Sequence, residues 1–406
     1  MKNSKKLPVS LLIALVGFGQ LSETIYTPAL PSLAQGLQTS AYMAEATLAI
    51  YFVGFALGVL LWGTISDRCG RKATMLCGLV IYSVATFCCA HSMSIQALLV
   101  WRFMQAFGIS VGSVITQTIL RDCCDGAERT RLFAIISGAL AFSPAIGPLL
   151  GGCIAQFFLW RANFWVLWLF SLVLLLWTVL CLKETRPKHI ARPQMGTLFF
   201  KMMSSRNLWG HILLIASTNG ILFGFYQEGP FVFIEQLGVE PTHYGLFGLL
   251  IAGSTFVAAR ISYRQKVDAH SQIFRGALFI LIGSLLLTMT ILTRLFDVHE
   301  IVVSLLPLSC IFFGIGLIIP NSLSHALKPY HEAIGTAGSI FGGLYYCLIA
   351  LCTLLMSTLH NGGPLPLALY MTFLGVVAVI GSKGVRPVDC PDLIAIKSRQ
   401  SQDPAS

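Results

Sequence analysis

Apolar residues dominate the chain in twelve runs, each close to the roughly 20 residues that an α-helix needs to cross a bilayer. Polar or charged positions separate the runs, and all but one of these separating segments are short. The pattern predicts twelve membrane-spanning helices, over residues 7–29, 43–65, 73–91, 95–119, 132–157, 161–182, 208–234, 243–263, 272–293, 300–326, 333–358 and 365–382.

The long separating segment, 183–207, is polar and basic and contains two prolines. It divides the predicted helices into six plus six. We therefore expect an N-terminal six-helix bundle over 1–182, a cytoplasmic linker over 183–207, a C-terminal six-helix bundle over 208–382 and a cytoplasmic tail over 383–406. The expected fold class is an all-α membrane protein with twelve transmembrane helices.

Composition supports this fold class, because 55% of the 406 residues are hydrophobic and only 11% are charged, against about 25% charged in soluble domains. The net charge of +10 does not indicate a nucleic-acid partner, since the basic residues follow the topology. With a cytoplasmic N-terminus, all 27 lysines and arginines except Arg102, Arg161 and Arg294 fall on the cytoplasmic side. Cytoplasmic loops carry such an excess, so both termini are expected in the cytoplasm.

Small residues recur at helical spacing in several of the predicted helices. Gly54 and Gly58 share a face of the second helix, and Gly335, Gly338 and Gly342 share a face of the eleventh. Small residues let helices approach closely in a bilayer. We expect close helix contacts at these positions, some of them between the two predicted bundles.

A very short connection between the second and third predicted helices carries the motif Gly63-x-x-x-Asp67-Arg68-x-Gly70-Arg71-Lys72. The motif resembles the signature loop of the major facilitator superfamily. The resemblance implies the major facilitator fold, and a pairing of Asp67 with Arg71 close to the start of helix eleven. Such a gating loop would hold one side of a transporter shut in one state. The alternative is that the charges only set topology, which accounts for Arg68 but not for Asp67.

Four further stretches are similar to one branch of this superfamily, the Bcr/CflA-type drug:proton antiporters. They are residues 23–31, 102–106 and 228–235, and an antiporter motif in helix five with Pro144, Gly147, Pro148, Gly151 and Gly152. The resemblance implies proton-coupled multidrug efflux across a bacterial inner membrane. Many relatives have an Asp four residues before the helix-one proline, whereas this chain has Thr24 there and its acid, Glu23, one place earlier.

Four ionisable residues are predicted at membrane depth, where a charge costs roughly 2.5–3.5 kcal/mol on insertion scales and marks a candidate functional site. We interpret Glu23 as a proton carrier; the alternative is a structural partner for Arg102. Arg102 would hold a nearby acid charged, or would reach the surface from its place near a helix start. Glu45 and Glu228 are further candidates for proton coupling. The alternative for Glu45 is a contact with the helix dipole, and for Glu228 a structural role beside a kink.

Polar and aromatic residues on the first, fourth and seventh predicted helices suit a substrate cavity, with interhelical contacts as the alternative. The candidate lining residues are Tyr26, Gln105, Gln117, Asn219, Phe223, Tyr226 and Gln227. Acids outnumber bases at membrane depth, and aromatic faces attract cations. The sequence therefore predicts a preference for neutral or cationic amphipathic small molecules, and the family resemblance implies that they are exported by alternating access.

No motif indicates an enzyme, and no phosphate-binding loop indicates ATP as the energy source. The proton gradient is expected to drive transport, without a cofactor or a metal site. The expected partners are a small-molecule substrate and the lipid bilayer, with no nucleic acid, and the expected state is a monomer. Two alternatives stay open: a transporter of one metabolite or siderophore, in either direction, and a membrane receptor without transport.

Overall fold

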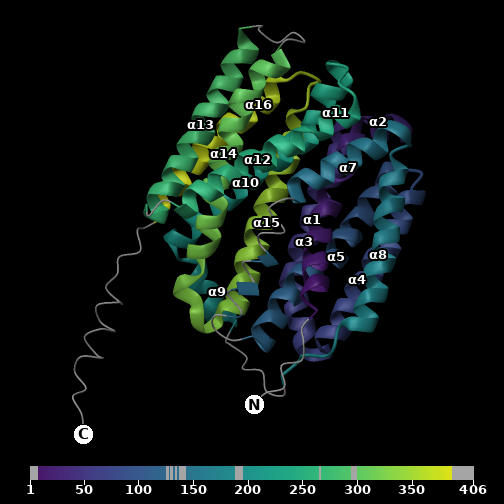
Figure 1. Cartoon of the computed structure of the whole chain (residues 1–406), viewed down its shortest axis with the longest axis vertical. Helices are drawn as coiled ribbons and strands as arrows, with labels where there is room; N and C mark the ends of the chain where they lie inside the picture. The colour runs from purple at the N-terminus through teal and green to yellow at the C-terminus, as the bar shows by residue number, and fades with distance from the viewer. Residues whose placement is uncertain are drawn as a thin grey trace, which may run out of the picture.

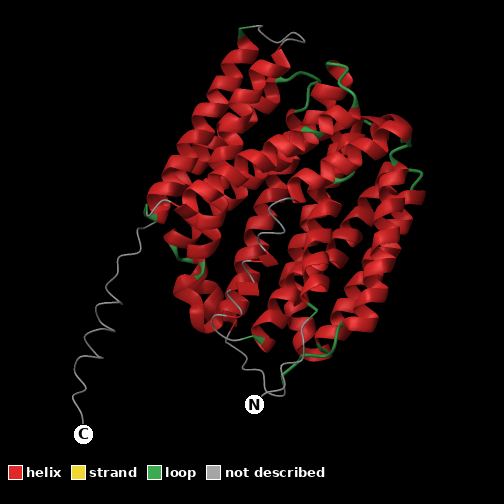
Figure 2. Cartoon of the chain, viewed as in Figure 1, coloured by secondary structure: helices red, strands yellow, loops and turns green. Residues whose placement is uncertain are grey.

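The computed structural model describes residues 8–124, 143–187, 195–264, 267–293 and 300–385, together with 128, 131, 132, 135 and 136, and leaves out the side chains of 143–145, 195, 300–302 and 331–334. Every regular element within these residues is a helix, and none is a strand (Figure 2). The predicted all-α membrane fold is confirmed.

The long helices stand side by side along the long axis of the molecule (Figure 1). In chain order the elements are α1 (Val9–Thr24), η1 (Thr27–Ala29), α2 (Leu30–Gly36), α3 (Ala41–Cys69), α4 (Arg71–His91), α5 (Ile95–Cys123), α7 (Ser143–Phe157), α8 (Arg161–Cys181), α9 (Met195–Met203), α10 (Arg206–Pro230), η2 (Phe231–Gln236), α11 (Pro241–Gly245), α12 (Phe247–Arg264), α13 (Ala269–Leu292), α14 (Glu300–Ala326), η3 (Lys328–Ala333), α15 (Ile334–Leu359) and α16 (Leu365–Gly384).

Among the described residues, eleven helical stretches are long and apolar enough to cross a membrane, and Ile146–Phe157 is a shorter apolar helix. Eleven of the twelve predicted ranges overlap one of the long stretches. In the remaining range, 132–157, residues 133, 134 and 137–142 lie outside the described residues. Some helices outrun their predicted ends: α3 continues past Ile65 to Cys69. Hydropathy marks where the apolar run stops, whereas the helix ends only at Gly70, whose φ of 96° breaks the α conformation.

The predicted linker contains a short helix, α9. Met202 is fully buried in a small apolar cluster with Leu208, Ile212 and Phe341, and Leu198 packs against that cluster. Residues 198 and 202 lie one helical turn apart, so they share one face. The polar composition of 183–207 hid this apolar face. The division of the chain into two bundles stays a prediction.

The first and the seventh of the predicted spanning helices change their helical geometry near prolines. The first passes from α1 through η1, which contains Pro28, into α2. The seventh passes from α10 into η2, a π-helical turn that begins directly after Pro230. Proline lacks the N–H that an α-helix needs, so the hydrogen-bond pattern shifts there. The predicted break beside Pro230 takes this form.

Glycines bring α3 close to a helix on either side. A side chain at Gly54 would overlap the Phe103 carbonyl of α5. On α15, a Cβ at Gly342 would lie 3.1 Å from Val59 of α3, and one at Gly343 would lie 2.6 Å from Leu60. The expected close contacts are therefore present, and α15 packs directly on α3.

Candidate functional site

A cavity of about 550 Å³ lies between α1, α3, α5 and α15. Its lining includes Asp67, Arg68 and Arg121 near the end of the molecule that carries Gly70, which we call the loop end. Deeper in the molecule it includes Tyr345 and Tyr346. The opposite end, which carries the start of α3, is called the far end. The glycine-rich first turns of α15 form one wall of the cavity.

Gln117, one of the seven predicted lining residues, lines this cavity. The other six are packed in the described structure, and their part in substrate binding stays a prediction. Their surroundings are as follows: Tyr26 and Gln105 contact Arg102, Asn219 donates to the Ile215 carbonyl, Phe223 packs 4.5 Å from the Phe52 ring, Tyr226 is buried, and Gln227 donates to Glu45.

Glu23 lies close to the deep part of the cavity. It shares a face of α1 with Val16 and Gln20, which line the cavity. Its carboxyl group interacts electrostatically with Arg102 and with the hydroxyl of Tyr346, another lining residue. The side chain is only 5% exposed. No described basic group lies within the 4.0 Å of an ion pair from it.

Arg102 is fully buried beside Glu23, so the alternative that it reaches the membrane surface is wrong. Its guanidinium lies 4.1 Å from the ring centre of Tyr26 and 4.3 Å from that of Tyr51. It donates a hydrogen bond to Gln105, while Nε and Nη2 have no hydrogen-bond partner among the described residues. Aromatic faces partly replace the lost water. A fixed positive charge therefore stands within electrostatic reach of Glu23.

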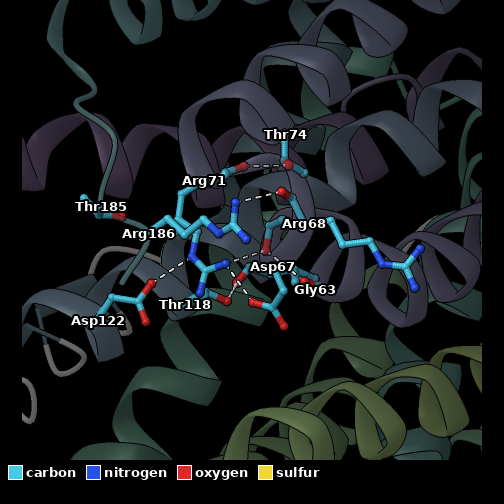
Figure 3. A network of polar contacts seen from close by, with 12 residues as sticks. Gly63, Asp67, Arg68, Arg71, Thr74, Thr118, Asp122, Thr185 and Arg186 are labelled. Carbon is cyan, nitrogen blue, oxygen red and sulfur yellow. Dashed lines mark hydrogen bonds and ion pairs between the residues drawn. The ribbon is translucent and has the colours of Figure 1, made fainter. Parts of the chain in front are cut away.

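At the signature loop, Arg71 lies between Asp67 and Asp122 (Figure 3). Glu184 joins them through the backbone of Arg71, and we call these four residues the loop cluster. Arg71 Nη1 lies 2.7 Å from Asp67 Oδ1, and Arg71 Nε lies 2.8 Å from Asp122 Oδ2. The Arg71 side chain is 3% exposed, against 43% for Asp67 and 14% for Asp122. The geometry agrees with the predicted pairing of Asp67 with Arg71 and adds Asp122, which the motif does not include.

Glu184 caps the start of α4. Its carboxylate accepts hydrogen bonds from the backbone N–H groups of Arg71 at 2.8 Å and Lys72 at 3.1 Å. Burial raises the pKa of Glu184, but backbone donors from Arg71, Arg186, Lys72 and Thr185 outweigh it and lower that pKa overall. Gly70 is required here because its φ is positive and because a Cβ would lie 2.5 Å from the Glu184 carboxylate. Arg186 also donates to the Arg68 carbonyl at 2.8 Å.

The other two motif positions of the loop, Gly63 and Arg68, both line the cavity. A Cβ at Gly63 would lie 3.7 Å from Ser339 of α15. Arg121 extends from α5 to the same helix, since a Cβ at Gly335 would lie 2.7 Å from its Nη1. The predicted neighbourhood of the loop and the start of helix eleven is therefore present. Its gating role stays a prediction.

The far end brings together Glu45 of α3, Glu228 of α10 and His360, which follows α15. His360 Nδ1 lies 2.8 Å from Glu228 Oε2 and 3.4 Å from Glu45 Oε1. Both glutamates are completely buried. Gln227 Nε2 donates to Glu45 Oε2 at 2.9 Å, to the Thr353 carbonyl at 2.9 Å and to Ser357 at 2.8 Å. We call Glu45, Glu228 and His360 the far-end cluster.

Sequence reasoning had selected Glu45 and Glu228 but not His360. The histidine follows an apolar run and precedes Asn361 and Gly362, which reads as an ordinary loop. A second cavity, of about 480 Å³, lies next to the cluster and is lined by His360 together with residues of α2 and η2. We call this cavity the far vestibule. His360 thus connects the cluster to the far vestibule.

The predicted antiporter motif lies between the end of α1 and α11. Side chains at Gly147 and Gly151 would overlap Thr24 and the Ile25 carbonyl, respectively. A side chain at Gly152 would overlap the Pro241 carbonyl of α11, and a Cβ at Gly245 would lie 2.8 Å from the Pro148 carbonyl. The glycines therefore allow the backbones of α1 and α11 to touch α7. The side chain of Pro144 lies outside the described residues.

Comparisons with known proteins agree with this architecture. The family model of the Major Facilitator Superfamily matches residues 12–353. A protein of Rickettsia bellii (strain RML369-C) described as "Uncharacterized transporter" is 34% identical, over 89% of this chain and 92% of its own length. "Multidrug resistance protein D" of Escherichia coli (strain K12) is 26% identical, over 91% and 93%. Among solved structures, a D-xylose-proton symporter has a TM-score of 0.76 at 14% identity, covering 93% of this chain and 98% of its own.

The symporter, at that identity, supports the fold alone, whereas the family match and the relative at 34% identity decide the family. These findings point to a transporter that is not an enzyme. The chain is a multi-pass membrane transporter for small molecules and belongs to the major facilitator superfamily.

Proposed function

We propose that this transporter exports neutral or cationic amphipathic small molecules in exchange for protons, as Bcr/CflA-type multidrug antiporters do. Glu23 is the observation that carries the proposal. It is a buried carboxyl group with no ion-pair partner among the described residues, close to a cavity that opens between four helices. A carboxyl group in such a place can bind and release a proton as its surroundings change. The relative named as a multidrug resistance protein supports the drug substrate.

The proposed orientation puts the loop end in the cytoplasm of a bacterium and the far end outside its inner membrane. The excess of basic residues on the loop side supports it. In this orientation the cavity lies on the cytoplasmic side, where an exported compound would enter. Alternating access would then close the loop end and open the far end.

The charges around the cavity support a preference for neutral or cationic compounds. Asp67, Arg68, Arg121 and Asp122 balance one another at its mouth. Arg102, which does not line the cavity, is covered by the rings of Tyr26 and Tyr51. The carboxylate of Glu23 is therefore the least compensated charge near the cavity. At low dielectric it attracts a cation strongly.

The experiment is transport into proteoliposomes under an imposed pH gradient, with ethidium as the probe. Wild-type protein should accumulate ethidium against its concentration gradient. Addition of ethidium should cause the protein to release protons. Glu23→Gln keeps the shape of the side chain but cannot carry a proton. It should abolish accumulation while leaving movement down a concentration gradient. Glu235→Gln, which changes an exposed acid of the far vestibule, is the matched control and should behave as wild type.

Two results would count against the proposal. If the wild type moves ethidium at the same rate with and without a pH gradient, transport is not proton-coupled. If Glu23→Gln still accumulates ethidium, the coupling carboxyl is another residue.

A further inference from the structure

The far-end cluster connects segments from both predicted bundles of the chain. Glu45 belongs to the second spanning helix, whereas Glu228 belongs to the seventh and His360 follows the eleventh. One carboxylate oxygen of each glutamate and one imidazole nitrogen of His360 all lie within 4.8 Å of one another. Any motion that opens the far end must therefore separate Glu45 from the other two. The cluster is a direct contact across the path that alternating access would open.

The cluster has more negative than positive charge. Two carboxylates and one imidazolium sum to −1, and both glutamates are fully buried. Glu45 Oε1 and Glu228 Oε1 have no hydrogen-bond partner in the described structure. A buried, uncompensated charge is costly. One additional proton, held between the two carboxyl groups, would make the cluster neutral and would give an unpartnered oxygen a hydrogen bond.

His360 supplies the fixed positive charge of this cluster. It lies just beyond the membrane-spanning part of α15 and its side chain is 17% exposed. The hydrogen bond to Glu228, followed by the interaction with the Glu45 carboxylate 3.4 Å away, raises the pKa of His360 to about 10. The imidazole is thus protonated at neutral pH, and the additional proton belongs to the carboxyl pair.

We propose that Glu45, Glu228 and His360 form a proton-binding site that closes the far end. The proposal rests on the alternating-access part of the proposed function. When the far end is closed, the buried cluster holds the additional proton. When the far end opens, Glu45 becomes exposed to water, which solvates its carboxylate. The proton is then released. A fall in external pH therefore favours closure.

Other groups that pack around His360 do not supply this proton site. Glu235 of η2 is the other charged residue that lines the far vestibule among the described residues, and it is exposed. The residues that α2 contributes to the vestibule, Gln35 among them, carry no charge. Phe231 places its ring centre 5.1 Å from the imidazole. The titration of closure should therefore depend on the cluster itself.

The experiment measures the closed-to-open ratio without a substrate. Protein in nanodiscs is exchanged into deuterated buffer between pH 5.5 and 8.5, and uptake is followed in peptides that cover residues 35–45 and 357–363. Rates are corrected for the intrinsic pH dependence of amide exchange. Binding one proton on closure changes the ratio tenfold per pH unit where that proton titrates. Wild-type protection should therefore rise up to tenfold for each unit that the pH falls.

Three variants test the assignment. Glu45→Gln and Glu228→Gln each remove one negative charge and make the cluster neutral without a further proton, so the pH dependence should disappear in both. His360→Gln removes the positive charge, so closure must neutralise two carboxylates. Protection should then change up to a hundredfold per pH unit and begin at lower pH. Glu235→Gln is the matched control and should keep the wild-type slope.

A merely structural role of His360 would lower protection at every pH without steepening its pH dependence, and that result would overturn the proposal. So would a wild-type slope in both glutamate variants. If a chelator in the buffer removes the wild-type slope, a bound divalent metal occupies the cluster instead of the proton. Because this assay contains no ethidium and no pH gradient, its outcome is independent of the transport test of the proposed function.

Discussion

Arg71 has two acidic partners, and they should contribute differently to stability and to transport. Asp122 is 14% exposed and Asp67 is 43% exposed, while the guanidinium between them is 3% exposed. Asp122→Asn should lower the free energy of unfolding by about 3 kcal/mol, because it leaves a buried cation with only its more exposed partner. Asp67→Asn should lower it by no more than about 1 kcal/mol, as for exposed ion pairs.

Transport should show the opposite order. Asp67 lines the cavity across from the first turns of α15, whose N-terminal dipole attracts an anion when the loop end closes. Asp67→Asn should therefore lower turnover by about tenfold, equivalent to about 1.4 kcal/mol in the barrier. Asp122→Asn, measured per folded molecule, should stay within about threefold of wild type.

The two assays are thermal unfolding of purified protein and initial rates of ethidium transport in proteoliposomes, normalised to the folded protein in the membrane. The reasoning is refuted if Asp67→Asn destabilises the protein as much as Asp122→Asn does. It is also refuted if Asp67→Asn transports at the normal rate.

Three further predictions follow from packing, charge and topology. Gly151→Ala should lower the free energy of unfolding by about 1–3 kcal/mol through overpacking against Ile25. Its control is Gly253→Ala, which meets nothing within 4 Å and should be neutral or stabilising in the same thermal assay. Ethidium should be displaced from purified protein at neutral pH by other lipophilic cations and not by polycarboxylates; the reverse result would favour the siderophore or metabolite alternative. Reporter insertions should place Lys201 in the cytoplasm and Gln35 outside, and a cytoplasmic signal at Gln35 would contradict the proposed orientation.

The fold could be predicted from the sequence because each spanning helix carries its own signal, a run of apolar residues. Local motifs were predictable because their residues are close together in the sequence. Asp67 and Arg71 are four residues apart, so a helical or turn geometry brings them together. Asp122 and Glu184 join them from 51 and 113 residues away along the chain. No spacing in the sequence encodes contacts of that kind.

The interpretation of Arg102 shows a second limit. Its place near the start of a helix allowed a surface position, but rings from other helices, including Tyr26, Tyr51 and Phe164, surround it. Similarly, His360 becomes a candidate site residue only because two glutamates from other helices contact it. The chemistry of the site was readable from the residue types, whereas the partners depended on how the helices pack.

The cap that Glu184 makes on α4 has a mechanical consequence. Its hydrogen bonds to the backbone of Arg71 and Lys72 anchor the chain just after α8. A force applied to the chain beyond Arg186 would therefore be transmitted to the start of α4 and to the signature loop, because Glu184 holds the backbone of Arg71 and Lys72 and Arg186 holds the Arg68 carbonyl.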